Sequence, residues 1–194
     1  MMFSLTSFLI FISVTAYTPG PNNIMSMSNA VRYGFKKSFP FNLGIWVGFS
    51  VFMLACAALG SIIFSRIAQA TMFMQLFGAA YMLFLAWQTW KSSSTIEIGE
   101  AQGATFASGA ALQFVNPKLY IYAVTSMSTF VLPYFHSAVT LAGFALFLAF
   151  FGFVASTTWA IFGSAFRKLL SAQAKIVNPI LAVLLVYCAI SLFL

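Results

Sequence analysis

The stretch Thr18-Pro19-Gly20-Pro21-Asn22-Asn23 lies inside a long apolar segment that begins near Met1 and runs to about Val31. Its two prolines and its glycine cannot continue a helix smoothly, because each proline removes a backbone donor and clashes with the preceding turn. In lipid, the freed backbone groups are costly unless protein or water satisfies them. The stretch therefore predicts a broken transmembrane helix whose break faces other protein or a watery cavity.

The composition of the 194 residues is that of an integral membrane protein. Hydrophobic residues make up 62% of the chain, charged residues only 6%, and the mean hydropathy is +0.98. A soluble domain carries about 25% charged residues, so no soluble fold could hide this apolar surface. The net charge of +7 is typical of a membrane protein whose basic residues set the orientation of its loops and attract anionic lipid head groups. We expect membrane lipid as the surroundings and no nucleic-acid partner.

Six apolar segments come close to the length of about 20 residues that a transmembrane helix needs. They are 3–31, 41–64, 71–90, 106–132, 137–166 and 176–194. The first is broken at Pro19 and the fourth at Pro117, within Asn116-Pro117-Lys118. Paired breaks at corresponding positions of two halves are a sequence indication of a transporter's binding site.

The polar loop 92–104 is the natural boundary between the two halves of the chain. Each half holds three segments, an odd number, so the second half must be inverted relative to the first. We therefore predict an all-α integral membrane protein with six transmembrane helices and a single transporter domain, 1–194. It consists of two inverted three-helix repeats, about 1–91 and 105–194, and the first helix of each repeat is broken at proline.

Basic residues gather in alternate loops of this arrangement. Loops one, three and five hold Arg32, Lys36, Lys37, Lys91, Arg167, Lys168 and Lys175, whereas loop two holds Arg66 alone. Cytoplasmic loops of membrane proteins carry an excess of lysine and arginine. The asymmetry predicts that both termini lie on the outer side of the membrane and that the loop 92–104 is cytoplasmic.

Lys118 falls near the middle of the fourth segment, where a charge is costly and normally finds a partner. No acid lies in any segment, since the only two, Glu97 and Glu100, are in the loop. Four fates are open to Lys118: it is neutral, it snorkels to the interface, it binds carbonyls at the broken helix ends, or it meets a charge on a substrate. A substrate carboxylate would suit it.

The two breaks offer complementary groups to a zwitterion. Each exposes N–H groups at the start of one half-helix, which favour an anion, and carbonyls at the end of the other, which favour a cation. Asn22, Asn23 and Asn116 add amide donors and acceptors, although an asparagine there can equally cap a half-helix. We predict a substrate site formed by Lys118, these three asparagines and Gly20, with Pro19, Pro21 and Pro117 making the breaks. Further candidates for its lining are Thr15, Tyr17, Thr18, Tyr120 and Tyr122.

The sequence gives no sign of an enzyme, a cofactor or a metal site. The segments hold no carboxylate or histidine for acid–base chemistry, and no phosphate-binding loop of the Walker type occurs. Transport would then be driven by a gradient or by a partner protein. With a proton gradient, Lys118 could carry the proton that Asp, Glu or His carries elsewhere. The pair Gly44 and Gly48 favours close helix packing, with a homodimer contact as the alternative use.

The Thr18–Asn23 stretch and the later Phe114-Val115-Asn116-Pro117-Lys118 resemble the LysE/RhtB family of bacterial amino-acid exporters, and the resemblance covers essentially the whole chain. It implies proton-driven export of a small neutral amino acid across the inner membrane, with both termini in the periplasm. The substrate would be of the cysteine/O-acetylserine or threonine/homoserine type. The stretches 111–118, 128–133 and 184–189 are most similar to the cysteine/O-acetylserine branch. The absence of a membrane acid also favours a neutral substrate, because a cationic one would want a fixed carboxylate.

Two other functions fit a small protein with proline-broken helices. A transmembrane thiol–disulfide electron carrier would need a reactive cysteine at each break, but Cys56 and Cys188 are far from Pro19 and Pro117 in sequence. Both are expected to be small buried hydrophobes. A passive channel is the second alternative, and it differs from a carrier because its flux does not saturate.

Overall fold

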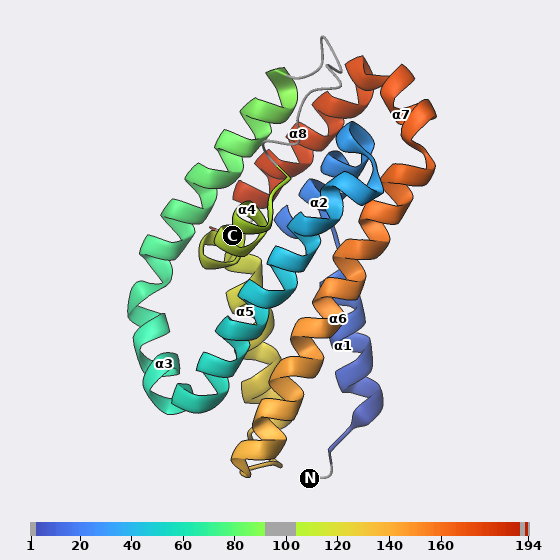
Figure 1. The fold of residues 1–194 in the computed structure, drawn as a ribbon. Coiled ribbons are helices and arrows are strands. Elements are labelled where there is room, and N and C mark those ends of the chain that lie inside the picture. Colours follow the sequence, from blue (N-terminus) through green and yellow to red (C-terminus); the bar gives the residue numbers. More distant parts are fainter. Residues whose placement is uncertain (1–2, 92–103, 191–192, 194) are drawn as a thin grey trace.

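The structure is a computed structural model that describes residues 3–91, 104–190 and 193. Throughout these residues the regular elements are helices, nine in number, as predicted for an all-α protein (Figure 1). In chain order they are α1 (Leu5–Tyr17), α2 (Pro21–Tyr33), α3 (Phe35–Lys91), α4 (Phe106–Val115), α5 (Pro117–Thr125), the π-helix η2 (Ser126–Val131), α6 (Ala138–Ala165), α7 (Arg167–Ala172) and α8 (Ala174–Ile190).

Helix α2 passes into α3 through a single residue, Gly34, whose φ of 80° lies in the left-handed region that favours glycine. The predicted basic loop at this position is therefore wrong. Lys36 and Lys37 lie in the first turn of α3, which begins before the expected start at Phe41. One left-handed residue is enough to redirect the chain, so no longer loop is needed.

Helix α3 spans both the second and the third predicted segments. The loop expected between them, 65–70, is instead part of the helical stretch, and the ribbon reverses direction at the lower end of Figure 1. We call residues 35–58 the first arm of α3 and residues 76–91 its second arm. The two arms run in opposite directions, so α3 supplies two antiparallel helical stretches.

Glycines allow the first arm to pack closely on α4. A Cβ atom added at Gly44 would lie 2.0 Å from the Phe106 carbonyl oxygen, and one at Gly109 would lie 2.0 Å from the Phe41 carbonyl oxygen. Gly48 also lies against α4, although less closely, with the Ala110 carbonyl oxygen 2.9 Å from such an atom. The glycine-bearing face is therefore used within the chain, and the homodimer contact that it suggested is not available there.

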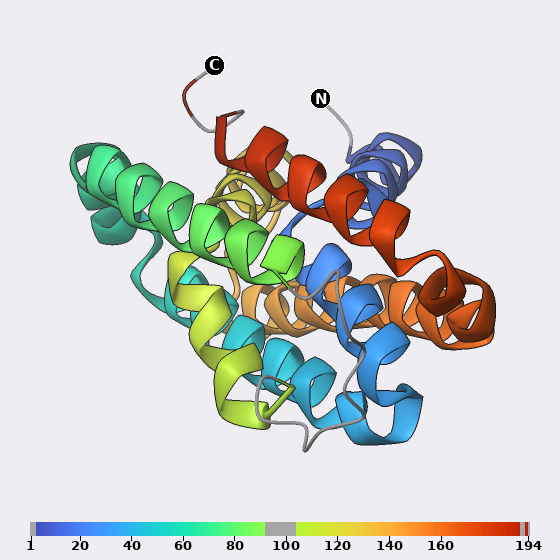
Figure 2. The same ribbon diagram turned by 90° about the horizontal axis from the view of Figure 1, so that it is seen from above.

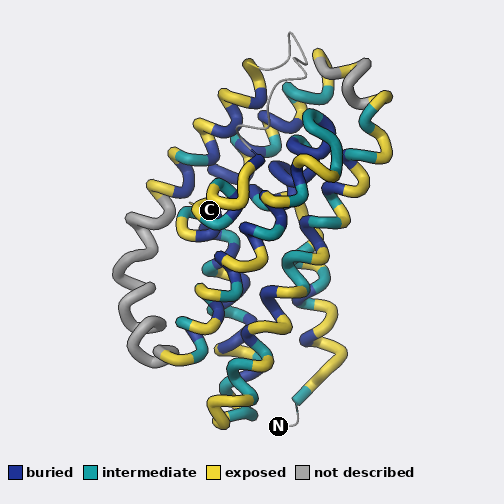
Figure 3. Tube along the Cα trace, viewed as in Figure 1, coloured by how far each residue is buried: buried dark blue, intermediate teal, exposed yellow. Residues whose placement is uncertain are grey.

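Helix α2 lies in the interior of the bundle although it is the more polar half of the first broken segment (Figure 3). It packs against α6 and α3, while α8 lies alongside the second arm of α3 (Figure 2). The outward faces of α6 and α8 carry large exposed side chains such as Val139, Phe162 and Val183. This arrangement, with a polar helix in the interior and apolar side chains on the outward faces, suits a lipid environment.

Two helical stretches of the described chain, Phe35–Ala58 and Ala138–Ala165, are each long and apolar enough to cross a membrane unaided. The stretches Leu5–Tyr17, Phe106–Val115 and Lys175–Ile190 are apolar but shorter. The first and fourth predicted segments are each divided into shorter helices, and both divisions fall at the predicted prolines.

Candidate functional site

The first break separates α1 from α2 by three residues. Helix α1 ends at Tyr17 with Thr18 as its C-cap, and α2 begins at Pro21 with Gly20 as its extended N-cap. Proline at the first position of a helix loses nothing, because the N–H that it lacks would have had no partner inside the helix. The break thus leaves carbonyl oxygens at the end of α1 and N–H groups at the start of α2.

The second break is a single residue. Asn116 ends α4 and also serves as the N-cap of α5, with Pro117 at the first helical position. Gly78 of the second arm of α3 lies against this break, since a Cβ atom there would be 2.6 Å from the Val115 carbonyl oxygen and 2.8 Å from Pro117 Cδ. On the other side, the Tyr120 hydroxyl donates to the Phe114 carbonyl oxygen at 2.9 Å. The second break is therefore tightly enclosed by protein.

Lys118 reaches across from the second break to the first. Its Nζ donates to the Thr18 carbonyl oxygen at 2.7 Å and lies 3.3 Å from Thr18 Oγ1. Asn23 Nδ2 donates to the same carbonyl at 2.9 Å and to the Ala16 carbonyl at 2.7 Å. Of the four fates open to Lys118, binding of carbonyls at a broken helix end is the one seen. Asn23 likewise caps the end of α1 rather than the start of α2.

Gly20 leaves the space that Lys118 occupies. A Cβ atom at Gly20 would lie 2.7 Å from Lys118 Cδ and 3.0 Å from its Nζ. The φ of Gly20 is −171°, an extended conformation that any residue adopts. Close approach of the lysine, and not backbone conformation, is therefore the reason for glycine at this position.

Three amides tie the two breaks together. Asn22 Nδ2 donates to Gln113 Oε1 at 2.9 Å, and Gln113 Nε2 donates back to Asn22 Oδ1 at 3.1 Å. Asn116 Nδ2 donates to the same Asn22 Oδ1 at 3.0 Å. Asn116 is 3% exposed, and its own Oδ1 has no hydrogen-bond partner among the described residues. A buried acceptor without a donor is costly, so this atom is suited to receive a ligand's N–H.

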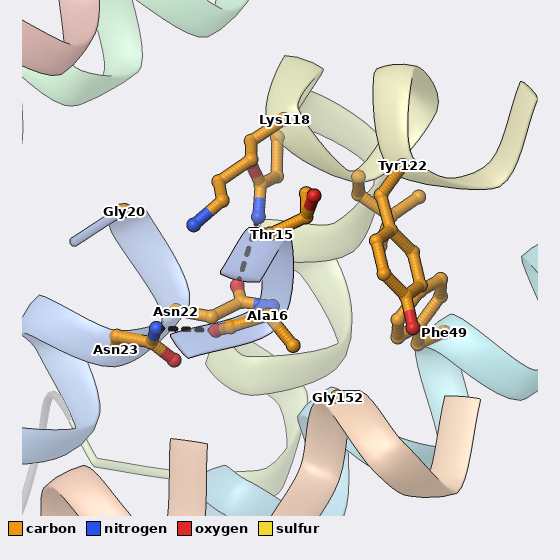
Figure 4. A pocket seen from close by; sticks show the side chains of 11 residues that line it. Thr15, Ala16, Gly20, Asn22, Asn23, Phe49, Lys118, Tyr122 and Gly152 are labelled. Carbon is orange, nitrogen blue, oxygen red and sulfur yellow. Dashed lines mark hydrogen bonds between the residues drawn. The ribbon is translucent and has the colours of Figure 1, made fainter. Parts of the chain in front are cut away.

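These groups surround an open space, here called the central cavity, with an empty volume of about 400 Å³ when open solvent is included. In Figure 4, Thr15, Asn22 and Lys118 lie along one side of it, and Phe49 and Tyr122 lie across from them. An adjoining cavity, of about 550 Å³ with open solvent included, shares Thr15, Gly20, Asn116 and Lys118 with it. The full lining of the central cavity is Thr15, Ala16, Gly20, Asn22, Asn23, Phe49, Asn116, Lys118, Leu119, Tyr122 and Gly152.

All five predicted binding residues, Gly20, Asn22, Asn23, Asn116 and Lys118, line the central cavity, and Pro19, Pro21 and Pro117 line the adjoining one. Of the further candidates, Thr15 and Tyr122 line the central cavity and Thr18 holds Lys118.

Two of the further candidates lie elsewhere. The ring of Tyr17 packs against Phe151. Tyr120 packs against Phe52, with ring centroids 4.5 Å apart, and its hydroxyl serves the end of α4. Neither residue lines the central cavity.

Gln113 is a member of the site that sequence reasoning missed. It is fully buried and forms hydrogen bonds with Asn22 and with the Gly109 carbonyl oxygen. The available signal was an amide in an apolar helix, three residues before Asn116 and so on the same helical face. Phe49 and Gly152, from α3 and α6, carried no such signal, because an apolar residue in a membrane helix looks the same wherever it faces.

Cys188 lies closer to the first break than its distance from Pro19 in the sequence suggested. Although it is far from Pro19 in sequence, its Sγ lies 4.0 Å from the Pro19 carbonyl oxygen, and it lines the adjoining cavity with Lys118. Cys56 belongs to a different packing cluster, with Phe49 and Met53. Both cysteines are buried, as expected, and they do not pair with each other.

Comparison with known proteins identifies one family and several relatives that share one name. The model of the LysE type translocator family matches residues 13–194. A protein of Klebsiella pneumoniae named cysteine/O-acetylserine efflux protein is 38% identical over 186 residues, which are 96% of this chain and 95% of that protein. Proteins of the same name from Escherichia coli and Shigella flexneri are each 38% identical over 190 residues, 97% of both chains. No solved structure matches the chain.

Proposed function

We propose a substrate for this chain, which belongs to the LysE type translocator family and is a membrane amino-acid efflux transporter and not an enzyme. The proposed substrate is a small neutral amino acid. Cysteine and O-acetylserine are the first candidates, because relatives that are 38% identical along nearly their whole length are named for efflux of these two. Threonine and homoserine are the next candidates, as amino acids of similar size and charge.

The observation that carries this proposal is that Lys118 and Asn116 both line the central cavity. An ammonium group has three donors, and Thr18 occupies only part of that capacity, so Lys118 can also receive a substrate carboxylate. The unpartnered Asn116 Oδ1 can accept from the substrate's ammonium group. The central cavity therefore offers a cation to one end of a zwitterion and an acceptor to the other.

The charge of the site supports a neutral amino acid over lysine or arginine. Glu97 and Glu100 are the only acidic side chains of the chain, and both lie in the stretch 92–104 and not in an apolar segment. A cationic side chain entering the central cavity would meet Lys118 with no carboxylate to balance it. A thiol, a hydroxyl or an acetyl ester needs only neutral hydrogen-bonding partners, and Thr15 and Tyr122 line the cavity.

The architecture that we propose is six membrane crossings in two inverted repeats, about 1–91 and 105–194, within one domain. The crossings are α1–α2, the two arms of α3, α4–α5–η2, α6 and α8. The α2–α3 junction, the end of α3 and helix α7 lie at one end of the bundle, and the start of α1 and of α6 at the other (Figure 1). The first end carries seven of the basic residues, which supports a cytoplasmic location for it and a periplasmic location for the termini.

Proton coupling is the part of the proposal that rests on Lys118. Among the described residues, no carboxylate or histidine lines the central or the adjoining cavity, so the lysine is the titratable group best placed to bind a proton and substrate in alternation. Rocking of one repeat against the other about the two breaks would then expose the site to each side in turn. We propose no cofactor, and protons as the coupling ion.

The experiment is efflux of cysteine, O-acetylserine, threonine and homoserine from cells expressing the chain or its Lys118→Gln variant. We expect selective efflux by the wild type and a loss of about tenfold or more in the variant, because a hydrogen bond to a charged group contributes about 1.5–3 kcal/mol. The matched control is Lys91→Gln, which removes the same charge from a lysine that lies over the Trp87 ring, away from the cavity.

Three outcomes are distinguishable when membrane abundance is equal. Loss in Lys118→Gln with normal efflux in Lys91→Gln supports the site. Equal efflux by all three proteins would return Lys118 to a structural role. Absence of efflux for all four amino acids by the wild type would exclude the proposed substrates.

A further inference from the structure

Another polar cavity, of about 770 Å³ with open solvent included, lies at the basic end of the bundle and takes no part in the site described above. It is formed by the last turns of α2 and the end of the second arm of α3, and we call it the α2–α3 pocket. Its lining residues are Met25, Ser28, Asn29, Arg32, Tyr33, Gln88 and Thr89, and none of them lines the central cavity.

The α2–α3 pocket offers donors for an anion. Asn29 is 5% exposed, and its Nδ2 has no hydrogen-bond partner in the described part of the chain. Arg32 contributes a guanidinium group, whose planar fork of N–H donors matches a carboxylate. The guanidinium lies 5.8 Å from the centroid of the Tyr33 ring, an interaction that leaves its N–H edge available.

The backbone that carries Arg32 is held in place by Arg167. Arg167 Nε donates to the Val31 carbonyl oxygen at 2.9 Å, and its Nη2 donates to the Arg32 carbonyl oxygen at 3.0 Å. These bonds satisfy carbonyls at the end of α2 that would otherwise lack partners. Arg32 is thus presented from a fixed helix end, which lowers the entropic cost of using it to bind a ligand.

A line of polar residues on α2 leads from this pocket toward the central cavity. Asn29, Ser26 and Asn22 are spaced so that they fall on one face of a helix with 3.6 residues per turn. Ser26 is fully buried, and its Oγ has no partner among the described residues. The opposite side of the helix is packed tightly, since a Cβ atom at Gly163 of α6 would lie 2.6 Å from the Met27 carbonyl oxygen. The two unpartnered polar atoms of α2, Ser26 Oγ and Asn29 Nδ2, therefore lie on the same face of the helix as Asn22.

We propose that the α2–α3 pocket is the cytoplasmic access site of the transporter, where Arg32 and Asn29 bind the carboxylate of the amino-acid substrate. The substrate then moves along the Asn29–Ser26–Asn22 face of α2 to the central cavity. This inference rests on the proposed function for the identity of the ligand and for the side of the membrane. The anion specificity of the pocket rests on its own residues and can be tested without transport.

The first test is transport kinetics of Arg32→Gln with cysteine supplied at the cytoplasmic face of inverted membrane vesicles. We expect KM to rise about tenfold while the maximal rate stays within twofold, because one charged hydrogen bond to the entering substrate is lost. Lys36→Gln is the matched control, since it removes a positive charge from the same end of the bundle outside the pocket lining. An unchanged KM in Arg32→Gln would overturn the proposal.

The second test uses thiol labelling and needs no transport. Ser28 lines the pocket, so Ser28→Cys in a Cys56→Ser, Cys188→Ser background places one reactive thiol there. Labelling is measured with an anionic and with a cationic membrane-impermeant methanethiosulfonate reagent. We expect the ratio of the anionic to the cationic labelling rate to be about tenfold higher with Arg32 present than after Arg32→Gln is added. Equal ratios with and without Arg32 would show that the pocket does not bind anions, and would overturn the proposal.

Added O-acetylserine, which has no thiol to consume the labelling reagent, distinguishes the substrate from an internal ligand. Slower labelling of Ser28→Cys in its presence supports the access site. If instead Glu97→Gln with Glu100→Gln accelerates anionic labelling and O-acetylserine gives no protection, the chain's own acids occupy the pocket and the proposal is wrong. If the wild type exports none of the amino acids, the proposed function fails, while the labelling ratio still decides whether Arg32 and Asn29 form an anion site.

Discussion

The two helix breaks arise from similar sequence but are satisfied in different ways. At the first, the freed carbonyl of Thr18 is bound by Asn23 from the same repeat and by Lys118 from the other. At the second, the Phe114 carbonyl is bound by Tyr120 from its own repeat, and Gly78 closes the backbone in. The first break thus depends on a long charged side chain from the other repeat, and the second on close packing of backbone.

Because of this difference, the central cavity has a positively charged end and an end with a hydrogen-bond acceptor. The second break sends its cation to the first, so positive charge lies near Thr18, whereas the unpartnered acceptor, Asn116 Oδ1, stays at the second. Two breaks satisfied in identical ways would present a substrate with two equivalent ends. Under the proposed function, this asymmetry would orient a zwitterion with its carboxylate toward Lys118 and its ammonium group toward Asn116.

Gly78→Ala is expected to have the largest effect, and it acts on the fold. The new Cβ would lie 2.6 Å from the Val115 carbonyl oxygen, and backbone at a packed break has little room to move. We expect a loss of about 1–3 kcal/mol or more in stability, as for overpacking in a protein core. Thermal unfolding in detergent measures it, and unchanged stability would show that the second break is not rigid.

Gly20→Ala is the matched change at the first break, and it should act on transport instead. The new Cβ meets the end of a flexible lysine, so the side chain swings away from Thr18 and the fold survives. We expect efflux to fall about tenfold, as for loss of one charged hydrogen bond, with a melting temperature near that of the wild type. A variant as unstable as Gly78→Ala would remove the distinction between the breaks.

Coupling between Asn22 and Asn116 tests whether the breaks brace each other. Their amides share one hydrogen bond of 3.0 Å within the buried network. A double-mutant cycle with Asn22→Ala and Asn116→Ala should give a coupling energy of about 0.6–1.7 kcal/mol in thermal stability, the range for such bonds in membrane helices. Additive effects of the two substitutions would mean that each break is held independently.

Tyr120→Phe should have the smallest effect of the series. It removes one hydrogen bond to the Phe114 carbonyl oxygen but keeps the ring that packs on Phe52. We expect a stability loss of about 0.6 kcal/mol and efflux close to that of the wild type, because this tyrosine does not line the central cavity. A large loss of efflux would show that the second break moves during transport.

Much of the candidate site could be predicted from the sequence because its residues carry local signals. Prolines ended the helices at the expected places, and Gly20, Asn22, Asn116 and Lys118 stand out as exceptions in apolar segments. Gln113 was missed even though it carries the same signal, because it is one turn away from the break.

Lining residues from other helices could not be found in this way. Phe49, Gly152 and Cys188 reach the two cavities from α3, α6 and α8. Nothing in a uniformly apolar helix marks the side that faces a cavity, since lipid and protein neighbours favour the same residue types.

The sequence by itself determined that the chain is an all-helical membrane protein with two breaks, because proline geometry and hydropathy act within a few residues. Only the tertiary structure decided that Lys118 binds Thr18, that Asn22 pairs with Gln113 and that a basic pocket lies at the end of α2. These pairings join residues that are far apart in the chain. They depend on how closely the glycine-lined helices approach one another, and local sequence does not encode that distance.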